Sequence, residues 1–133
     1  MKALIQRVSR ASVTVDAQKI SHINVGILAY IGLGHDDNID SARRMIDKIL
    51  TYRIFENKDD PDKYGKLDQN LQQVGGSLLL VSQFTLMAKT NKGRRPDFGA
   101  AMAPNHAQVL FADLVAYAQT QHTEVASGQF GAD

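Results

Sequence analysis

Two apolar runs of strand length constrain the fold of this chain most strongly. The first is Gly26–Gly32, and the second is Ser77–Leu86, which follows a pair of glycines and changes from hydrocarbon to polar side chains at its far end. Continuous apolar runs of this length, bounded by glycines, are typical of strands that are buried on both faces of a sheet. We therefore predict that both runs are strands inside one core.

Shorter strands are predicted on either side of these runs. Residues 4–8, 12–15 and 19–24 precede the first run, alternate between apolar and polar side chains, and predict an antiparallel meander. Residues 124–127 predict a last strand.

Two helices are predicted from the three- and four-residue spacing of apolar side chains. One covers residues 38–52, and the other begins near Pro104 with a proline suited to a first helical turn. The polar stretch 57–65 is predicted to be a surface loop. The sequence thus predicts an α+β fold with an antiparallel or mixed sheet, a barrel-like core and two main helices, in a single domain over residues 1–133.

Composition restricts the chemistry that this domain performs. The chain has 133 residues and a formal net charge of +1, so RNA would be bound by a local patch. It has no cysteine, which excludes thiol nucleophiles and thiolate metal sites. Its start becomes polar within a few residues and no run approaches a membrane span, so we expect no signal peptide, no membrane contact and a cytoplasmic location.

The familiar sequence patterns of hydrolases and metal sites are missing. There is no GxSxG, phosphate-loop or HExxH motif, and the four histidines (His22, His35, His106 and His122) lie far apart without ligand spacing. We interpret each histidine as an ordinary surface or loop residue, and His35-Asp36-Asp37 as a loop with helix-capping carboxylates. We predict no metal.

Ser82-Gln83-Phe84-Thr85 is the sharpest chemical signal in the sequence. If the strand continues through it, Gln83 and Thr85 project from one face. An amide and a hydroxyl in this position can hold a carbonyl oxygen or a water, although neither is a base near neutral pH. The alternative is a strand that simply emerges into solvent.

A basic stretch follows this strand end. Residues 89–96 carry four positive charges, on Lys89, Lys92, Arg94 and Arg95, and no acid. Such a loop can hold phosphate oxygens, or it can be solvated without a ligand. Phe84 and Phe98 either stack on a base or belong to the core.

Taken together, five collinear motifs resemble the D-aminoacyl-tRNA deacylase family nearly from end to end. They are Ala3–Val8 with Ala11–Val15, Tyr52–Phe55, Gly75–Ser77, Ser82–Thr85 and Gly93–Phe98. The resemblance implies a homodimer that hydrolyses the ester joining a D-amino acid, or glycine, to the terminal adenosine of tRNA, without a metal or cofactor.

The resemblance also assigns roles to residues. The family's catalytic motif matches Ser82, Gln83 and Thr85. The substrate would be bound by Ser82, Gln83 and Phe84. RNA would be bound by the basic stretch, through Lys89, Lys92, Arg94 and Arg95. Thr85 is one candidate nucleophile, and a competing view assigns the reaction to the RNA's own 2′-hydroxyl and to backbone groups. We favour the RNA hydroxyl, because no base stands beside Thr85 in the sequence.

Two departures from the family pattern bear on function. The family's second motif, a Gly-Pro segment that excludes L-amino acids, would follow Gly128–Asp133, so the sequence shown lacks that segment and a final strand. Asp97 stands where the family usually has serine. These departures keep two alternatives open: a catalytically impaired tRNA-binding relative, and a purely structural dimerisation module.

Overall fold

The computed structural model describes residues 1–132, and the expectation that concerns the end of the chain at Asp133 lies outside the described residues. Strands and helices alternate in the predicted order. The elements are β1 (Lys2–Val8), β2 (Ala11–Val15), β3 (Gln18–Ile23), β4 (Gly26–Gly32), α1 (Ile39–Thr51), the 3-10 helix η1 (Pro61–Lys63), β5 (Ser77–Ser82), the 3-10 helix η2 (Phe84–Met87), α2 (Pro104–Gln121) and β6 (Val125–Ser127).

The central sheet is mixed and has the strand order β1-β4-β5-β6. β4 pairs with β1 in antiparallel and with β5 in parallel orientation, and β6 extends the parallel part. A domain of class α+β with a mixed sheet and two helices is therefore confirmed.

The predicted meander is wrong, and the predicted barrel-like closure is not found within residues 1–132. β2 pairs only with β3, in a separate two-stranded sheet, while β1 pairs with β4 in antiparallel orientation. The reason is local: Asp16 and Ala17 both have positive φ, the backbone of a tight hairpin turn, so β2 folds back directly on β3. The two sheets remain open.

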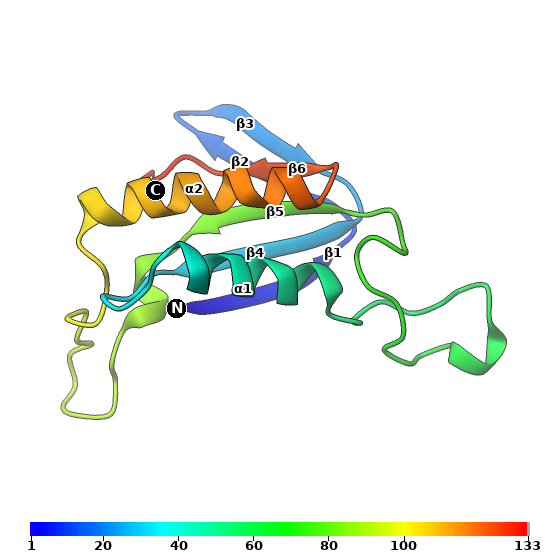
Figure 1. Cartoon of the computed structure of the whole chain (residues 1–133), viewed down its shortest axis with the longest axis horizontal. Coiled ribbons are helices and arrows are strands. Elements are labelled where there is room, and N and C mark those ends of the chain that lie inside the picture. Colours follow the sequence, from blue (N-terminus) through cyan, green and yellow to red (C-terminus); the bar gives the residue numbers. More distant parts are fainter. Residues whose placement is uncertain (133) are drawn as a thin grey trace.

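Both helices lie on one face of the central sheet (Figure 1). On that face Ile27, Ala29 and Ile31 of β4 are fully buried and belong to the core cluster together with Leu78 and Leu80 of β5. The predicted burial of both apolar runs is thus confirmed on the helix-covered face, whereas Leu28 and Tyr30 of β4 are only half-buried on the opposite face. Burial of this hydrocarbon surface is the main driving force for folding.

Helix α1 begins at Ile39 and is capped by Asn38, not by the carboxylates of Asp36 and Asp37. The Asn38 side chain accepts a hydrogen bond from the Ser41 backbone N–H at 3.0 Å, and the Ser41 hydroxyl accepts one from the Asn38 backbone N–H at 3.0 Å. This reciprocal capping satisfies N–H groups that have no partner inside the helix. The predicted range 38–52 included the two cap residues, Asn38 and Tyr52.

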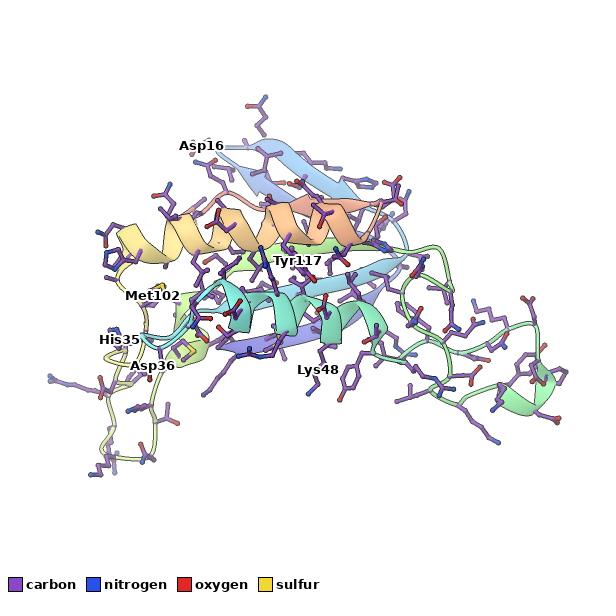
Figure 2. All side chains as sticks on the ribbon, viewed as in Figure 1. Asp16, His35, Asp36, Lys48, Met102 and Tyr117 are labelled. Atoms are coloured by element: carbon purple, nitrogen blue, oxygen red, sulfur yellow. The ribbon has the colours of Figure 1, made fainter. Side chains whose placement is uncertain are left out.

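Helix α2 starts with Pro104 in its first turn and packs an apolar face against α1 and the sheet. Figure 2 shows Tyr117 of α2 pointing toward α1, where its hydroxyl donates to Asp47 Oδ1 at 2.6 Å. The pKa of the Tyr117 hydroxyl is raised, chiefly by this hydrogen bond to Asp47 and secondly by desolvation. The contact joins the two helices above the core.

Within the described part of the chain, neither helix is long and apolar enough to cross a membrane.

The opposite face of the sheet is covered only in part. The β2–β3 hairpin packs over β5 and β6, where the Ser21 hydroxyl donates to the Ser127 carbonyl oxygen. On β1, Leu4 points away from the helices and is 57% exposed, next to the half-buried Tyr30 of β4. A partly apolar surface therefore remains on β1 and β4.

Candidate functional site

The polar end of β5 opens into a cavity of about 660 Å³. Four sections of the chain form its walls: the segment after β4, the end of β5, the segment that leads into the first turn of α2, and the last described residues. The lining residues are Leu33, His35, Ser82, Gln83, Phe84, Phe98, Ala101, Met102, Ala103, Pro104, Ala107, Phe130, Gly131 and Ala132. The cavity thus combines a mainly apolar wall with a few polar groups, as small-ligand sites do.

The predicted strand 77–86 ends earlier than expected. β5 stops at Ser82, and Phe84–Met87 forms a 3-10 turn in which the Ala88 N–H donates to the Thr85 carbonyl oxygen at 3.1 Å. The cause is that Gln83 is the last residue held by β4, through its N–H bond to the Ile31 carbonyl oxygen at 2.8 Å. The strand alternation that placed Gln83 and Thr85 on one face therefore does not apply.

Gln83 and Thr85 nevertheless meet. The side-chain amide Nε2 of Gln83 donates a hydrogen bond to Thr85 Oγ1. Ser82 and Gln83 are half-buried and line the cavity, whereas Thr85 is exposed and is not among the lining residues. The 3-10 turn thus presents Gln83 to the cavity and places Thr85 beside it.

Phe84 and Phe98 stand together at the cavity. Their ring centroids are 5.3 Å apart in an edge-to-face arrangement, and the side chains are 59% and 38% exposed. Neither ring belongs to the buried core, so the core interpretation of both residues is not supported. Two aromatic rings that line a cavity and remain accessible offer an apolar contact surface to a ligand.

The four predicted RNA-binding cations lie on a hairpin-like loop next to the cavity. Lys89 and Asp97 exchange two backbone hydrogen bonds, of 2.7 and 2.9 Å, and Gly93 at the turn has a positive φ of 69°. Lys89, Lys92, Arg94 and Arg95 are all exposed, and among residues 1–132 none of them forms a salt bridge. Their charges are therefore available to an anionic partner.

Asp97, the departure from the family pattern, has a local role in this loop. Its Oδ1 accepts a hydrogen bond from the Gly99 N–H at 2.8 Å, and its own backbone pairs with Lys89. The carboxylate is thus engaged in the turn that follows the basic loop.

The sequence did not indicate the cavity wall that faces the end of β5, which is formed by Leu33, His35 and residues 101–103. Figure 2 shows His35 and Met102 at the same end of the molecule, although one precedes α1 and the other precedes α2. His35 Nε2 contacts the Gly99 carbonyl oxygen, and the Met102 N–H donates to the Leu33 carbonyl oxygen at 2.9 Å. The residues of this wall are mostly small or apolar, so no motif marked them, and the interpretation of His35 as an ordinary loop residue overlooked its position.

Two residues after His35, the Asp37 carboxylate has three polar partners. Its burial raises the pKa, but the α-amino group of Met1 at 2.7 Å, the Gly34 N–H at 2.7 Å and the Ser41 hydroxyl at 3.0 Å outweigh that effect. The net result is a lowered pKa and a stable negative charge. No group of three or more histidine, cysteine or acidic side chains in the described chain is arranged to hold a metal ion.

The fold is that of a known class of small α+β proteins. A solved structure described as the c-Myc DNA Unwinding Element Binding Protein superposes with a TM-score of 0.91 at 34% identity, and covers 100% of this chain and 87% of that one.

Sequence comparison gives the family. The family model described as D-Tyr-tRNA(Tyr) deacylase matches residues 4–133. The D-aminoacyl-tRNA deacylases of Psychrobacter arcticus and Acinetobacter baylyi are 74% and 53% identical over 133 residues, which is 100% of this chain and 88% of each relative. The chain belongs to the D-Tyr-tRNA(Tyr) deacylase family, and the resemblance predicted from its motifs is confirmed.

Proposed function

We propose that this chain hydrolyses the ester bond of D-aminoacyl-tRNA, and of mischarged glycyl-tRNA, in the cavity at the end of β5. The observation that carries the proposal is family membership over residues 4–133, combined with identities of 74% and 53% to D-aminoacyl-tRNA deacylases. These findings confirm the predicted class of activity, an ester hydrolase that acts on aminoacyl-tRNA. The cavity, the residue roles and the range of amino acids belong to the proposal.

In this proposal the aminoacyl group enters the cavity and Ser82, Gln83 and Phe84 contact it. The Gln83 amide and the Ser82 hydroxyl are the polar groups at the strand end, and Phe84 supplies an apolar wall. Donors placed toward a developing oxyanion are worth about 3 to 4 kcal/mol of transition-state stabilisation each. Hydrolysis breaks the bond between the acyl carbon and the ribose oxygen, and water supplies the second oxygen of the released carboxylate.

Thr85 acts through Gln83 in this proposal. Its hydroxyl oxygen accepts the Gln83 amide N–H, which fixes the orientation of the amide and leaves the second amide hydrogen and Oε1 for the substrate. The 2′-hydroxyl next to the ester acts as a positioned proton-transfer group for the attacking water, and that water supplies the new carboxylate oxygen. An ester that is oriented in this way needs no strong protein base.

The basic loop holds the acceptor end of the tRNA. Lys89, Lys92, Arg94 and Arg95 lie in the loop that leads to Phe98, so phosphates bound there would place the terminal nucleotide near the cavity. Arginine binds phosphate oxygens in a two-point geometry, and lysine does so as a point charge.

Incubation of the purified chain with D-tyrosyl-tRNA tests the function directly. We expect ester loss well above the rate in buffer, with L-tyrosyl-tRNA as the matched substrate that reports chiral selectivity. Loss of the D-ester no faster than in buffer contradicts the proposal for this chain.

Nucleic-acid binding without turnover is the second candidate function. It is favoured by the exposed basic loop and by the c-Myc DNA Unwinding Element Binding Protein, whose name describes a DNA-binding protein. It predicts retention of tRNA that weakens steeply with salt, with no ester loss. The deacylase assay run beside a binding assay separates the two candidates.

We also propose a cytoplasmic homodimer. The support for a second copy is the uncovered face of β1 and β4, where Leu4 is 57% exposed beside Tyr30. The cytoplasm is where aminoacyl-tRNA is used. Sedimentation of the wild-type chain and of Leu4→Glu tests the dimer: the wild type should sediment as a dimer and the variant as a monomer. A wild-type monomer at all concentrations contradicts it.

A further inference from the structure

His35 connects the segment between β4 and α1 to the loop that carries Phe98. Its Nε2 contacts the Gly99 carbonyl oxygen, a partner 64 positions away in the sequence. Because a carbonyl oxygen only accepts hydrogen bonds, Nε2 must carry the hydrogen. The contact is therefore a donated hydrogen bond between two chain sections that both contribute lining residues to the cavity.

This side-chain contact is the last of three hydrogen bonds that join residues 33–35 to residues 99–102. The Met102 N–H donates to the Leu33 carbonyl oxygen at 2.9 Å, and the His35 N–H donates to the Ala100 carbonyl oxygen at 3.2 Å. The His35 side chain extends the series by one residue, to Gly99, and so reaches the neighbour of Phe98.

Beyond Gly99, the loop bonds mainly to itself. Asp97 Oδ1 accepts the Gly99 N–H, and Asp97 exchanges backbone hydrogen bonds with Lys89. Within residues 1–132, no backbone hydrogen bond joins the section from Lys89 to Phe98 to the sheet or to either α-helix. Phe98 meets the Phe84 ring edge to face, at 5.3 Å between centroids, and its own carbonyl oxygen accepts a hydrogen bond from the Ala101 N–H at 3.0 Å.

We propose that His35 is a positioning residue that holds Phe98 at the mouth of the cavity and fixes the base of the basic loop. This inference rests on the function proposed above, because the loop is assigned there to the tRNA and Phe98 lines the cavity that is assigned to the aminoacyl group. Without the hydrogen bond to Gly99, the loop and Phe98 occupy the binding-competent arrangement for a smaller fraction of the time. A reduced competent fraction weakens apparent binding by that same factor.

Substitution of His35 by alanine should therefore raise KM more than it lowers kcat. We expect KM for D-tyrosyl-tRNA to rise by about three- to tenfold and kcat to change by less than about twofold, since bound substrate itself orders the loop. His35→Gln offers an amide donor in a similar place and should recover most of the loss.

His122 provides a matched control. Its Nε2 contacts the Gly76 carbonyl oxygen at 2.8 Å, so His122→Ala removes the same kind of bond between a histidine ring and a glycine carbonyl. This contact lies at the C-terminal end of α2, whereas the cavity lies at its N-terminal end (Figure 1). His122→Ala should leave KM unchanged.

A second measurement needs no substrate and so separates failure of this inference from failure of the proposed function. Trypsin cleaves after Lys89, Lys92 and Arg94, and a loosened loop is cut faster. With intact protein followed by mass spectrometry, His35→Ala should be cut in this loop about three- to tenfold faster than the wild type, and His122→Ala at the wild-type rate.

The two readouts together decide the proposal. Faster loop cleavage with an unchanged KM in an active chain overturns the role of His35 in positioning the loop and Phe98 for substrate. Faster loop cleavage with raised KM supports the positioning role. Faster loop cleavage in a chain whose wild type does not hydrolyse D-aminoacyl-tRNA supports the role of His35 in fixing the loop, and overturns the proposed function alone. Unchanged loop cleavage in His35→Ala, or an equal rise of cleavage in His122→Ala, overturns the positioning role.

Discussion

The side-chain amide of Gln83 donates a hydrogen bond to the hydroxyl oxygen of Thr85, although only Gln83 lines the cavity. A threonine nucleophile requires a base that accepts its hydroxyl proton. Among residues 1–132, no side chain accepts a hydrogen bond from Thr85 Oγ1, and this oxygen is itself an acceptor. The relationship therefore favours an orienting role for Thr85 over a nucleophilic one.

Removal of the Thr85 hydroxyl should weaken catalysis without abolishing it. We expect Thr85→Ala to lower kcat/KM by about three- to tenfold, the value of one hydrogen bond, and Gln83→Ala to lower it by about a hundredfold. Steady-state hydrolysis of D-tyrosyl-tRNA measures both. Complete loss in Thr85→Ala, together with a trappable aminoacyl-enzyme in the parent, would establish the nucleophilic role instead.

The RNA hydroxyl can be tested from the substrate side. D-Tyrosyl-tRNA whose terminal adenosine lacks the 2′-hydroxyl should react at least about a hundredfold more slowly, since catalysis by a positioned proton-transfer group is typically of that size. Its binding, measured by inhibition of the normal substrate, should change little. Full activity on the modified substrate contradicts RNA assistance.

The basic loop should determine the salt dependence of tRNA binding. Arg94→Ala and Arg95→Ala should each lower the slope of log affinity against log salt by about one, because each removes a phosphate contact. Lys19→Ala is a matched control, since Lys19 is an exposed cation on the β2–β3 hairpin. Equal effects of all three substitutions would show that only net charge matters.

Asp37 should make folding stability depend on acid. The ordinary pKa of this carboxyl group is 3.8, and folding lowers it, so folding favours the ionised form. The corresponding stabilisation is present above pH 3.8 and is lost as the pH falls through the lower, folded-state pKa. Urea unfolding at several pH values should show a smaller acid-induced loss in Asp37→Asn, which we expect to be about 1 to 3 kcal/mol less stable at neutral pH.

The turn between β2 and β3 can be improved. Ala17 has a φ of 63°, a left-handed conformation that costs an L-residue about 1 to 2 kcal/mol. Ala17→Gly should therefore raise the free energy of unfolding by about 1 kcal/mol, measured by urea denaturation with an unchanged slope. Ala112→Gly, at an exposed position within α2, should lower it by about the same amount.

Periodicity and glycine boundaries were sufficient to predict the strands and helices, because these signals are local. The pairing was not predictable in the same way: β1 lies next to β4 because the Asp16–Ala17 turn commits β2 to β3, and a turn with alanine at positive φ carries no sequence signature. The end of β5 at Ser82 was also missed, since it depends on how far β4 continues beside it.

The sequence predicted one side of the candidate site and not the other. Ser82–Phe84 stood out because polar residues end an apolar strand, and they do line the cavity. The facing wall did not, because Ala101, Met102 and Ala103 carry no reactive group, and because His35 meets Gly99 only after the chain folds.

The parallel pairing of β4 with β5 has a consequence for how the chain reaches this structure. Ile27 lies beside Leu78, its partner about 50 positions further along the chain, so two distant segments must be brought together before the core closes. Contacts between distant segments form slowly, and until then the leucines of β5 are exposed to solvent and to other chains. We therefore expect newly made protein to aggregate through Ser77–Ser82 when folding is slowed, and this segment is the natural binding target for a molecular chaperone.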